Sequence, residues 1–225
     1  MRYRLLSVSF RDVVVIEVGI YDDHDYGLND GDRTFPDKYL VQDYLLDFLD
    51  VEESDVRRER NGVYSSFQFG EGKESVSVFL LDTRFFAERN VDILGEKQWD
   101  WLENELKMTE SEVNLIVSGI QIMPHDKMMS EKWGNFPGSA ERLTYLIGKY
   151  DVPGVVFLSG DIHCGEILKF FPFMFLITRF NCSHIGYPLF EITSSGLTHS
   201  FKTQARVLSE FGYKFISTNT LIEPK

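Results

Sequence analysis

Cysteine and basic residues are both scarce in this sequence. Cys164 and Cys182 are its only cysteines, too few for a disulfide framework, and they do not form a paired-cysteine zinc motif. Lysine and arginine number 23 against 35 aspartates and glutamates, and the net charge of −12 argues against a surface that binds nucleic acid or anionic lipid. A solvated acidic surface explains such a charge, and carboxylates gathered around cations are the alternative.

The sequence also lacks a recognisable signal peptide and a membrane-spanning run. Residues 1–20 contain several arginines together with Asp12 and Glu17, so they have no long uncharged core of the kind a signal peptide needs. Residues 170–180 are densely apolar, but this stretch contains Pro172 and is too short to cross a bilayer. We expect a buried strand or an insertion there. Neither the compartment nor the oligomeric state follows from the sequence.

Composition and periodicity predict one α/β domain over residues 1–225. A hydrophobic content of 43% and an aromatic content of 14% suffice for a sizeable core. Apolar runs alternate with segments of helical periodicity, which favours an α/β fold. Strands are expected over residues 13–20, 62–69, 75–81, 113–117, 155–158 and 189–192, with a hairpin turn at 70–72. Amphipathic helices are expected over residues 37–49, 95–106 and 139–150.

Polar residues follow four of the predicted strands. They lie in the segments 22–30, 82–84, 118–121 and 159–166. In α/β folds, loops at strand ends commonly carry binding and catalytic residues on a rigid scaffold. Four such loops predict one functional rim rather than four unrelated turns.

The first loop, residues 22–30, places several aspartates and Asn29 around His24. These hard oxygen ligands favour a cation, because without one the carboxylates repel each other and raise one another's pKa values. The spacing excludes an EF-hand, since Gly27 and Leu28 fall where a ligand and the glycine should be. An exposed acidic turn is the competing interpretation.

The other loops offer further candidates. Asp161 and His163 could face one cation if their segment is extended, because side chains i and i+2 lie on the same side of a strand; a structural histidine is the alternative. Arg84 could clamp a phosphoryl group, or it could form an ion pair with Asp82. Gln121 offers one neutral oxygen ligand or a hydrogen bond.

Taken in order, several motifs resemble the PhoD-like metallophosphatases, the alkaline phosphatase D family within the calcineurin-like phosphoesterases. The resemblance covers about residues 22–200. The motifs are Asp-Asp-His-Asp-Tyr-Gly-Leu-Asn from Asp22, Leu-Asp-Thr-Arg from Leu81, Leu-Gly-x-x-Gln-Trp-x-Trp-Leu from Leu94, Trp-Gly-Asn-Phe-Pro from Trp133, Ser-Gly-Asp-Ile-His-Cys-Gly-Glu from Ser159, and Glu-Ile-Thr-Ser-Ser-Gly-Leu-Thr from Glu191.

This resemblance implies a two-sheet β sandwich flanked by helices, with a site for two or more metal ions at the strand ends. Iron, calcium or manganese would suit the oxygen-rich loop. The implied metal ligands are Asp23, Asn29, Gln121, Asp161 and His163. Of these, Asp161 replaces a histidine that is usual in the superfamily, and Gln121 stands where many members have a metal-binding histidine.

The implied activity is metal-assisted hydrolysis of a small phosphomonoester or phosphodiester. His24 would act as general acid or hydrogen-bond donor to phosphate, Asp25 would orient it, and Arg84 would contact the phosphate.

The sequence departs from the family pattern before residue 22. Two family motifs that carry an early metal-binding aspartate and a bridging Gly-Asp have no counterpart there, since Asp12 is the sole aspartate before Asp22 and lies outside a Gly-Asp pair. The apolar stretch 170–180 is a further departure. We therefore expect a chain that lacks the N-terminal part of the fold and binds metal weakly. The alternative function is a catalytically inactive family fragment or pseudophosphatase that acts as a binding module.

Overall fold

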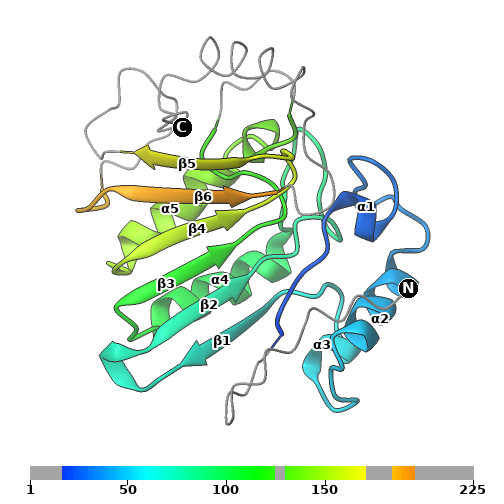
Figure 1. Ribbon diagram of the computed structural model, residues 1–225, viewed down its shortest axis with the longest axis horizontal. Helices are drawn as coiled ribbons and strands as arrows, with labels where there is room; N and C mark the ends of the chain where they lie inside the picture. Colours follow the sequence, from blue (N-terminus) through cyan, green and yellow to red (C-terminus); the bar gives the residue numbers. More distant parts are fainter. Residues whose placement is uncertain (1–16, 125–129, 171–183, 196–225) are drawn as a thin grey trace.

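A mixed six-stranded sheet organises the part of the chain that the computed structural model describes, residues 17–124, 130–170 and 184–195. Its order is β1-β2-β3-β4-β6-β5 (Figure 1). The strands are β1 (Ser65–Phe69), β2 (Val76–Leu80), β3 (Val113–Val117), β4 (Val155–Ser159), β5 (Gly165–Phe170) and β6 (Leu189–Ser194). Strands β2, β3, β4 and β6 are parallel, and β1 and β5 pair antiparallel at the two edges. The carboxyl ends of the four parallel strands therefore share one edge of the sheet.

Two helices cover one face of the sheet, and three others stand beside its carboxyl-end edge (Figure 1). The covering helices are α4 (Glu96–Met108) and α5 (Ser139–Lys149). The others are α1 (Asp23–Tyr26), α2 (Lys38–Phe48) and α3 (Val56–Glu59). In the described part of the chain, no helix combines the length and the apolar character needed to cross a membrane.

The main core lies between the sheet and helices α4 and α5. Trp99, Leu102 and Leu106 recur at helical spacing on α4 and are almost fully buried, as amphipathic periodicity predicts. Trp99 meets Trp133 edge to face, with ring centroids 6.1 Å apart. Phe157 of β4 belongs to the same cluster. This packing fixes the parallel strands and so the positions of the loops that follow them.

Most predicted elements are confirmed with small changes in their bounds. The hairpin of β1 and β2, strands β3, β4 and β6, and helices α2, α4 and α5 all form where periodicity placed them. Strand β5 was not predicted. The strand expected over residues 13–20 is wrong for residues 17–20, which form no strand, and its first four residues lie outside the described part of the chain.

The helical spacing of Tyr39, Leu40, Tyr44, Leu45 and Phe48 predicts the apolar face of helix α2, but only Leu45 of this set is even partly buried. The apolar residues Leu40, Tyr44 and Phe48 are 49%, 62% and 74% exposed, whereas Gln42 and Leu46 are buried. Gln42 explains the difference, because its amide nitrogen donates to the carbonyls of residues 57 and 60 and its oxygen accepts from the nitrogen of residue 62. The helix is thus oriented by hydrogen bonds to the neighbouring loop.

The α/β class is confirmed, and the described residues form one sheet rather than two. The sheet face opposite α4 and α5 is apolar but only half-buried at Leu115, Val117, Val156 and Leu158. Ile192 on this face is 42% exposed. Of the apolar stretch 170–180, residue 170 ends β5 and the rest lies outside the described residues.

Candidate metal and phosphate site

Three loops meet where parallel strands β2, β3 and β4 end. Backbone bonds continue the sheet past its last strand residues: Leu81 N donates to Val117 O at 2.9 Å, and Gly160 N donates to Gly119 O at 3.0 Å. The residues that follow β2, β3 and β4 are therefore held at one edge. The predicted single rim is formed by these three loops, with the segment around α1 beside them (Figure 1).

Asp82 organises the loop after β2 through four hydrogen bonds. Its Oδ1 accepts the backbone nitrogens of Arg84 and Phe85 at 3.0 and 2.9 Å. Its Oδ2 accepts the hydroxyl of Tyr21 at 2.7 Å and the backbone nitrogen of Val63 at 2.9 Å. A carboxylate that accepts this many bonds pins the chain around it. Asp82 is thus a structural residue that positions the loop.

Gln98 of α4 holds the same loop from the helix layer. Its Oε1 accepts the backbone nitrogen of Asp82 and its Nε2 donates to the backbone oxygen of Asp82, both at 2.8 Å. Gln98 is fully buried, so these bonds are shielded from water. The family motif that begins at Leu94 thereby connects the helix with the rim.

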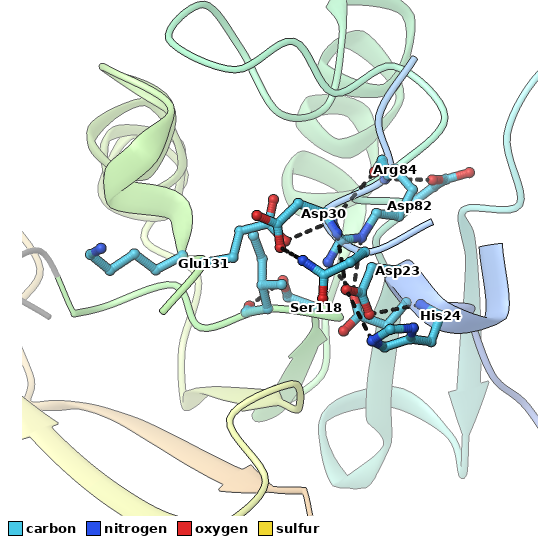
Figure 2. A network of polar contacts seen from close by, with 12 residues as sticks. Asp23, His24, Asp30, Asp82, Arg84, Ser118 and Glu131 are labelled. Carbon is cyan, nitrogen blue, oxygen red and sulfur yellow. Dashed lines mark hydrogen bonds and ion pairs between the residues drawn. The ribbon is translucent and has the colours of Figure 1, made fainter. Parts of the chain in front are cut away.

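Arg84 lies at the centre of the polar network in Figure 2, and 1% of its side chain is exposed. Its Nε and Nη2 donate to Oδ1 of Asp22 at 2.9 and 2.5 Å. Its Nη1 lies 2.7 Å from Oε2 of Glu131. The sequence alternative, an Arg84 to Asp82 ion pair, is replaced by a backbone contact with Asp82 and side-chain pairs with two other carboxylates. The arginine thus carries its charge in a buried site at the strand ends.

Three aspartates gather beside this arginine. Asp22, Asp23 and Asp161 each offer a carboxylate oxygen, and these oxygens all lie within 4.8 Å of one another. Asp23 is nearly buried, and the other two are partly buried. Oxygen donors at such spacing suit a hard cation. The segment around α1 and the loop after β4, 138 residues apart between Asp23 and Asp161, supply this cluster together.

The electrostatics of the cluster also favour a cation. Burial, together with the neighbouring Asp22 and Asp23 carboxylates, raises the pKa of Asp161 to about 7, and Arg84 opposes this rise. Burial likewise raises the pKa of Asp22, against the lowering effect of Arg84. Carboxylates this close destabilise each other's charged forms unless positive charge lies between them. The donor set therefore fits a bound metal ion.

The close packing of the aspartate cluster requires that residue 119 is a glycine, without a Cβ atom. A Cβ atom there would lie 2.5 Å from Oδ1 of Asp22 and 3.0 Å from Oγ1 of Thr83. Thr83 is fully buried, and its hydroxyl has no hydrogen-bond partner among the residues that the structure describes. A buried hydroxyl without a partner costs free energy, so an additional ligand beside the aspartates would also satisfy Thr83.

The loop 22–30 does not bring all its predicted residues into the cluster. Asp23 accepts the backbone nitrogens of His24 at 2.7 Å and of Asp30 at 3.1 Å, which closes the loop around it. The His24 side chain is 71% exposed, with Nε2 3.9 Å from Oδ2 of Asp23. Asp25 is exposed. Asn29, also exposed, donates to Oδ1 of Asp30 at 3.0 Å.

Gln121 occupies a separate buried polar cluster. Its Nε2 donates to Oε2 of Glu166 and to Oγ1 of Thr193, both at 2.8 Å. Glu191 on the same side accepts the backbone nitrogens of Ile122 and Met123 at 2.8 and 2.9 Å. These carboxylates hold the loop after β3 from inside the core.

The segment from Asp161 to His163 turns instead of continuing the strand. Both residues have positive φ, 70° and 56°, and Ile162 N donates to Gly160 O at 2.9 Å. The condition under which Asp161 and His163 could face one cation, an extended segment, is therefore not met. Asp161 joins the aspartate cluster, while His163 is exposed and its backbone nitrogen donates to Oγ of Ser195 at 3.1 Å.

Sequence reasoning missed four residues that shape the rim. Asp22 was in the acidic run, but nothing distinguished it from its neighbours as the partner of Arg84. Gln98 lay inside a recognised motif, which was the available signal. Thr83 also lay inside a recognised motif, Leu-Asp-Thr-Arg, but its residue type did not indicate a buried hydroxyl. Glu131 gave no signal, because a loop carboxylate is an ordinary surface residue until the fold buries it.

Comparisons with known proteins agree with this architecture. A solved structure described as the structure of PhoD matches with a TM-score of 0.59 and 18% identity. The match covers 80% of this chain and 39% of that one, so this chain spans well under half of the length of the protein it matches. A search of curated proteins finds no significant match. The sequence pattern of the PhoD-like phosphatases matches residues 45–198, well over half of the chain, and the protein therefore belongs to the PhoD-like phosphatase family.

Proposed function

We propose that this protein is a metal-dependent hydrolase of small phosphoesters. The observation that carries the proposal is the grouping of three carboxylate oxygens within 4.8 Å next to Arg84 at the carboxyl ends of parallel strands. A cation site beside a buried arginine suits a phosphoryl group, which needs positive charge on several oxygens. Membership of the PhoD-like phosphatases supports the same reaction class.

Asp22, Asp23 and Asp161 would hold the metal. Bound there, a cation such as iron, calcium or manganese would supply positive charge for the phosphate oxygens and an acidified water. The partly buried aspartates keep the ligand oxygens in place, since Asp23 is fixed by backbone nitrogens and Asp22 by Arg84. We propose two or more metal ions for the complete site, with Asn29, Gln121 and His163 as the further candidate ligands.

Arg84 would bind and orient the phosphoryl group. Its planar fork of N–H donors matches phosphate oxygens in a bidentate geometry. The hydrogen bonds that Asp82 makes to the loop backbone keep this side chain at the rim. His24, 71% exposed, can approach a leaving-group oxygen from solvent and donate a proton to it, with Asp25 on the same short helix as its proposed orienting partner.

One observation favours the second candidate function, a binding module without turnover. Arg84 is already paired with two carboxylates, Asp22 and Glu131. A rim with its arginine neutralised in this way could hold a cation or a phosphoester without the positive charge needed for hydrolysis. The two functions differ in turnover and share the metal site.

Metal analysis and hydrolysis assays on the same purified protein test the proposal. We would measure bound metal after supplying iron, manganese and calcium, together with hydrolysis of an aryl phosphomonoester and an aryl phosphodiester. Asp161→Asn removes one ligand, and Asp100→Asn, on the exposed side of α4, is the matched control.

The hydrolase proposal predicts stoichiometric metal and turnover in the wild type and in D100N, with loss of both in D161N. Removal of one metal ligand should reduce affinity or activity by at least about tenfold, as outer-shell changes already do. Bound metal with no turnover of either ester would favour the binding module. Turnover that is unchanged in D161N would contradict the proposed site.

A further inference from the structure

We propose that Glu131 occupies the position on Arg84 that an anionic substrate oxygen takes, so that a phosphoryl group must displace Glu131 to bind. The inference rests on the proposed function, in which Arg84 binds phosphate. It concerns access to the arginine, a property that can be measured whether or not the protein turns over a substrate.

The donor positions of Arg84 are nearly filled by protein atoms. Asp22 receives Nε and Nη2 at 2.9 and 2.5 Å. Nη1 lies 2.7 Å from Oε2 of Glu131 and 3.4 Å from the backbone oxygen of Gly31. With 1% of its side chain exposed, the guanidinium cannot meet an incoming anion in this arrangement. One of the two carboxylates has to leave first.

Glu131 is the carboxylate that can leave at lower cost. Asp22 is adjacent to Asp23 at the start of α1 and belongs to the three-aspartate cluster, so moving it would disrupt the metal ligands. Glu131 itself belongs to no helix or strand, although Lys132 beside it forms an isolated bridge with Gln121, and it contacts Arg84 through a single oxygen. A carboxylate held by one contact is displaced more readily than one that receives two N–H groups from the same fork.

Glu131 also has the negative charge that a group in the position of a phosphoryl oxygen would need. Its side chain is 9% exposed, and a buried carboxylate is stable only when a cation neutralises it. Arg84 supplies that charge in the substrate-free protein. A phosphoryl oxygen has the same charge sign and the same geometry toward a guanidinium, so the two anions compete for one position.

The competition between Glu131 and an anion should change the apparent affinity for that anion by a measurable factor. If the conformation with Glu131 displaced is about a tenth of the population, the apparent affinity for an anion is reduced about tenfold, and removing the competing charge restores it. Glu131→Gln keeps the size of the side chain and removes its charge. Glu131→Asp keeps the charge but is shorter by one methylene, so it should release Arg84 as well.

Chemical modification of Arg84 by phenylglyoxal, mapped by mass spectrometry, tests the proposal directly. The wild type should react slowly at Arg84, and both E131Q and E131D should react about tenfold faster, in line with the population above. Inorganic phosphate, added with Mn²⁺, should slow modification in E131Q at about tenfold lower concentration than in the wild type. Glu96→Gln is the matched control, because it removes a carboxylate that pairs with Arg142 at 2.8 Å between α4 and α5.

Two results would overturn the inference. One is an Arg84 that stays as unreactive in E131Q and E131D as in the wild type, with folding verified by thermal unfolding. The other is a reactive Arg84 that phosphate protects no better than in the wild type, as expected if Glu131 only positions the arginine. If E131Q shows faster modification and tighter phosphate protection while no variant hydrolyses a phosphoester with any metal, the inference on Glu131 stands and the hydrolase proposal fails.

Discussion

Oδ1 of Asp22 accepts both Nε and Nη2 of Arg84, at 2.9 and 2.5 Å. This pair connects residues 62 positions apart and fastens the acidic segment at α1 to the end of β2. A short loop of like charges would otherwise move away from the other carboxylates of the rim. The geometry of the proposed cation site therefore depends on a buried arginine as well as on the aspartates.

Replacing Arg84 with methionine should destabilise the protein strongly. Removal of one partner from a buried charge network leaves uncompensated charges and costs about 3–5 kcal/mol. Asp22 and Glu131 would both lose their cation. We expect urea unfolding to show this loss, whereas Arg142→Met, which breaks the exposed pair with Glu96, should change stability by about 1 kcal/mol or less. Equal effects of the two substitutions would contradict the importance given to the Arg84 network.

Gly119→Ala should disrupt the cluster of Asp22, Asp23 and Asp161 by crowding Asp22. The added methyl group would lie 2.5 Å from Oδ1 of Asp22, so the carboxylate or the backbone has to shift. We expect a loss of about 1–3 kcal/mol in unfolding free energy, which is typical of overpacking, together with weaker metal binding by calorimetry.

Gly186→Ala is the matched control for this substitution, because nothing lies within 4 Å of its ideal Cβ. Its unfolding free energy and metal affinity should stay close to those of the wild type. Wild-type metal affinity in G119A would show that the close approach of Gly119 and Asp22 does not matter for the site.

Glu191→Gln tests the buried support of the loop after β3. Both carboxylate oxygens accept backbone nitrogens, from Ile122 and Met123, and an amide would turn an N–H group toward one of these donors. We expect a loss of about 2 kcal/mol. For a chain of this size, that corresponds to a fall of about 4–8 °C in Tm, measured by calorimetry. The control Glu112→Gln changes an exposed residue and should leave Tm nearly constant.

The pH dependence of stability should contain a contribution from Asp55, which caps α3. The side chain of Arg57 donates to Asp55 at 2.9 and 2.8 Å, and this hydrogen bonding lowers the pKa of Asp55 to about 2. Because the folded-state pKa lies below the unfolded value, the stabilisation is fully present above about pH 4 and is lost as the pH falls toward 2.

Asp55→Asn isolates this charge effect, since asparagine also caps helices well. D55N should unfold more easily than the wild type at pH 6, and the difference between the two proteins should shrink between about pH 4 and pH 2. A difference that stays constant over this range would show that the charge of Asp55 does not contribute.

Periodicity and turn chemistry were sufficient to predict the elements that build the sheet and its covering helices. The apolar spacing of Trp99, Leu102 and Leu106 identified α4, and the glycine turn before Ser75 identified the β1–β2 hairpin. Helix α2 was found as well, but the prediction of its buried face was wrong, because hydrogen bonds of Gln42 to residues 57–62 outweighed the apolar pattern. Such tertiary contacts leave no local signal.

The candidate site was predictable in its location and less so in its geometry. Strand-end loops pointed to one rim, and Asp161 does meet Asp23 there. The left-handed turn at Asp161 and His163 is rare for residues other than glycine, so alternation could not anticipate it. The pairing of Arg84 with Glu131 joins two loops whose contact is created only when the sheet assembles.

The hydrogen bonds between Gln98 and the main chain of Asp82 bear on how this rim could be transplanted. Residues 82–84 form a three-residue loop, yet two of the bonds that shape it come from a side chain in the first turn of α4. A graft of the loop sequence alone onto another sheet would lose its conformation. Any engineered scaffold would have to include a helix that places a glutamine against the main chain of the residue that follows the strand. The minimal transferable unit is therefore strand, loop and helix together.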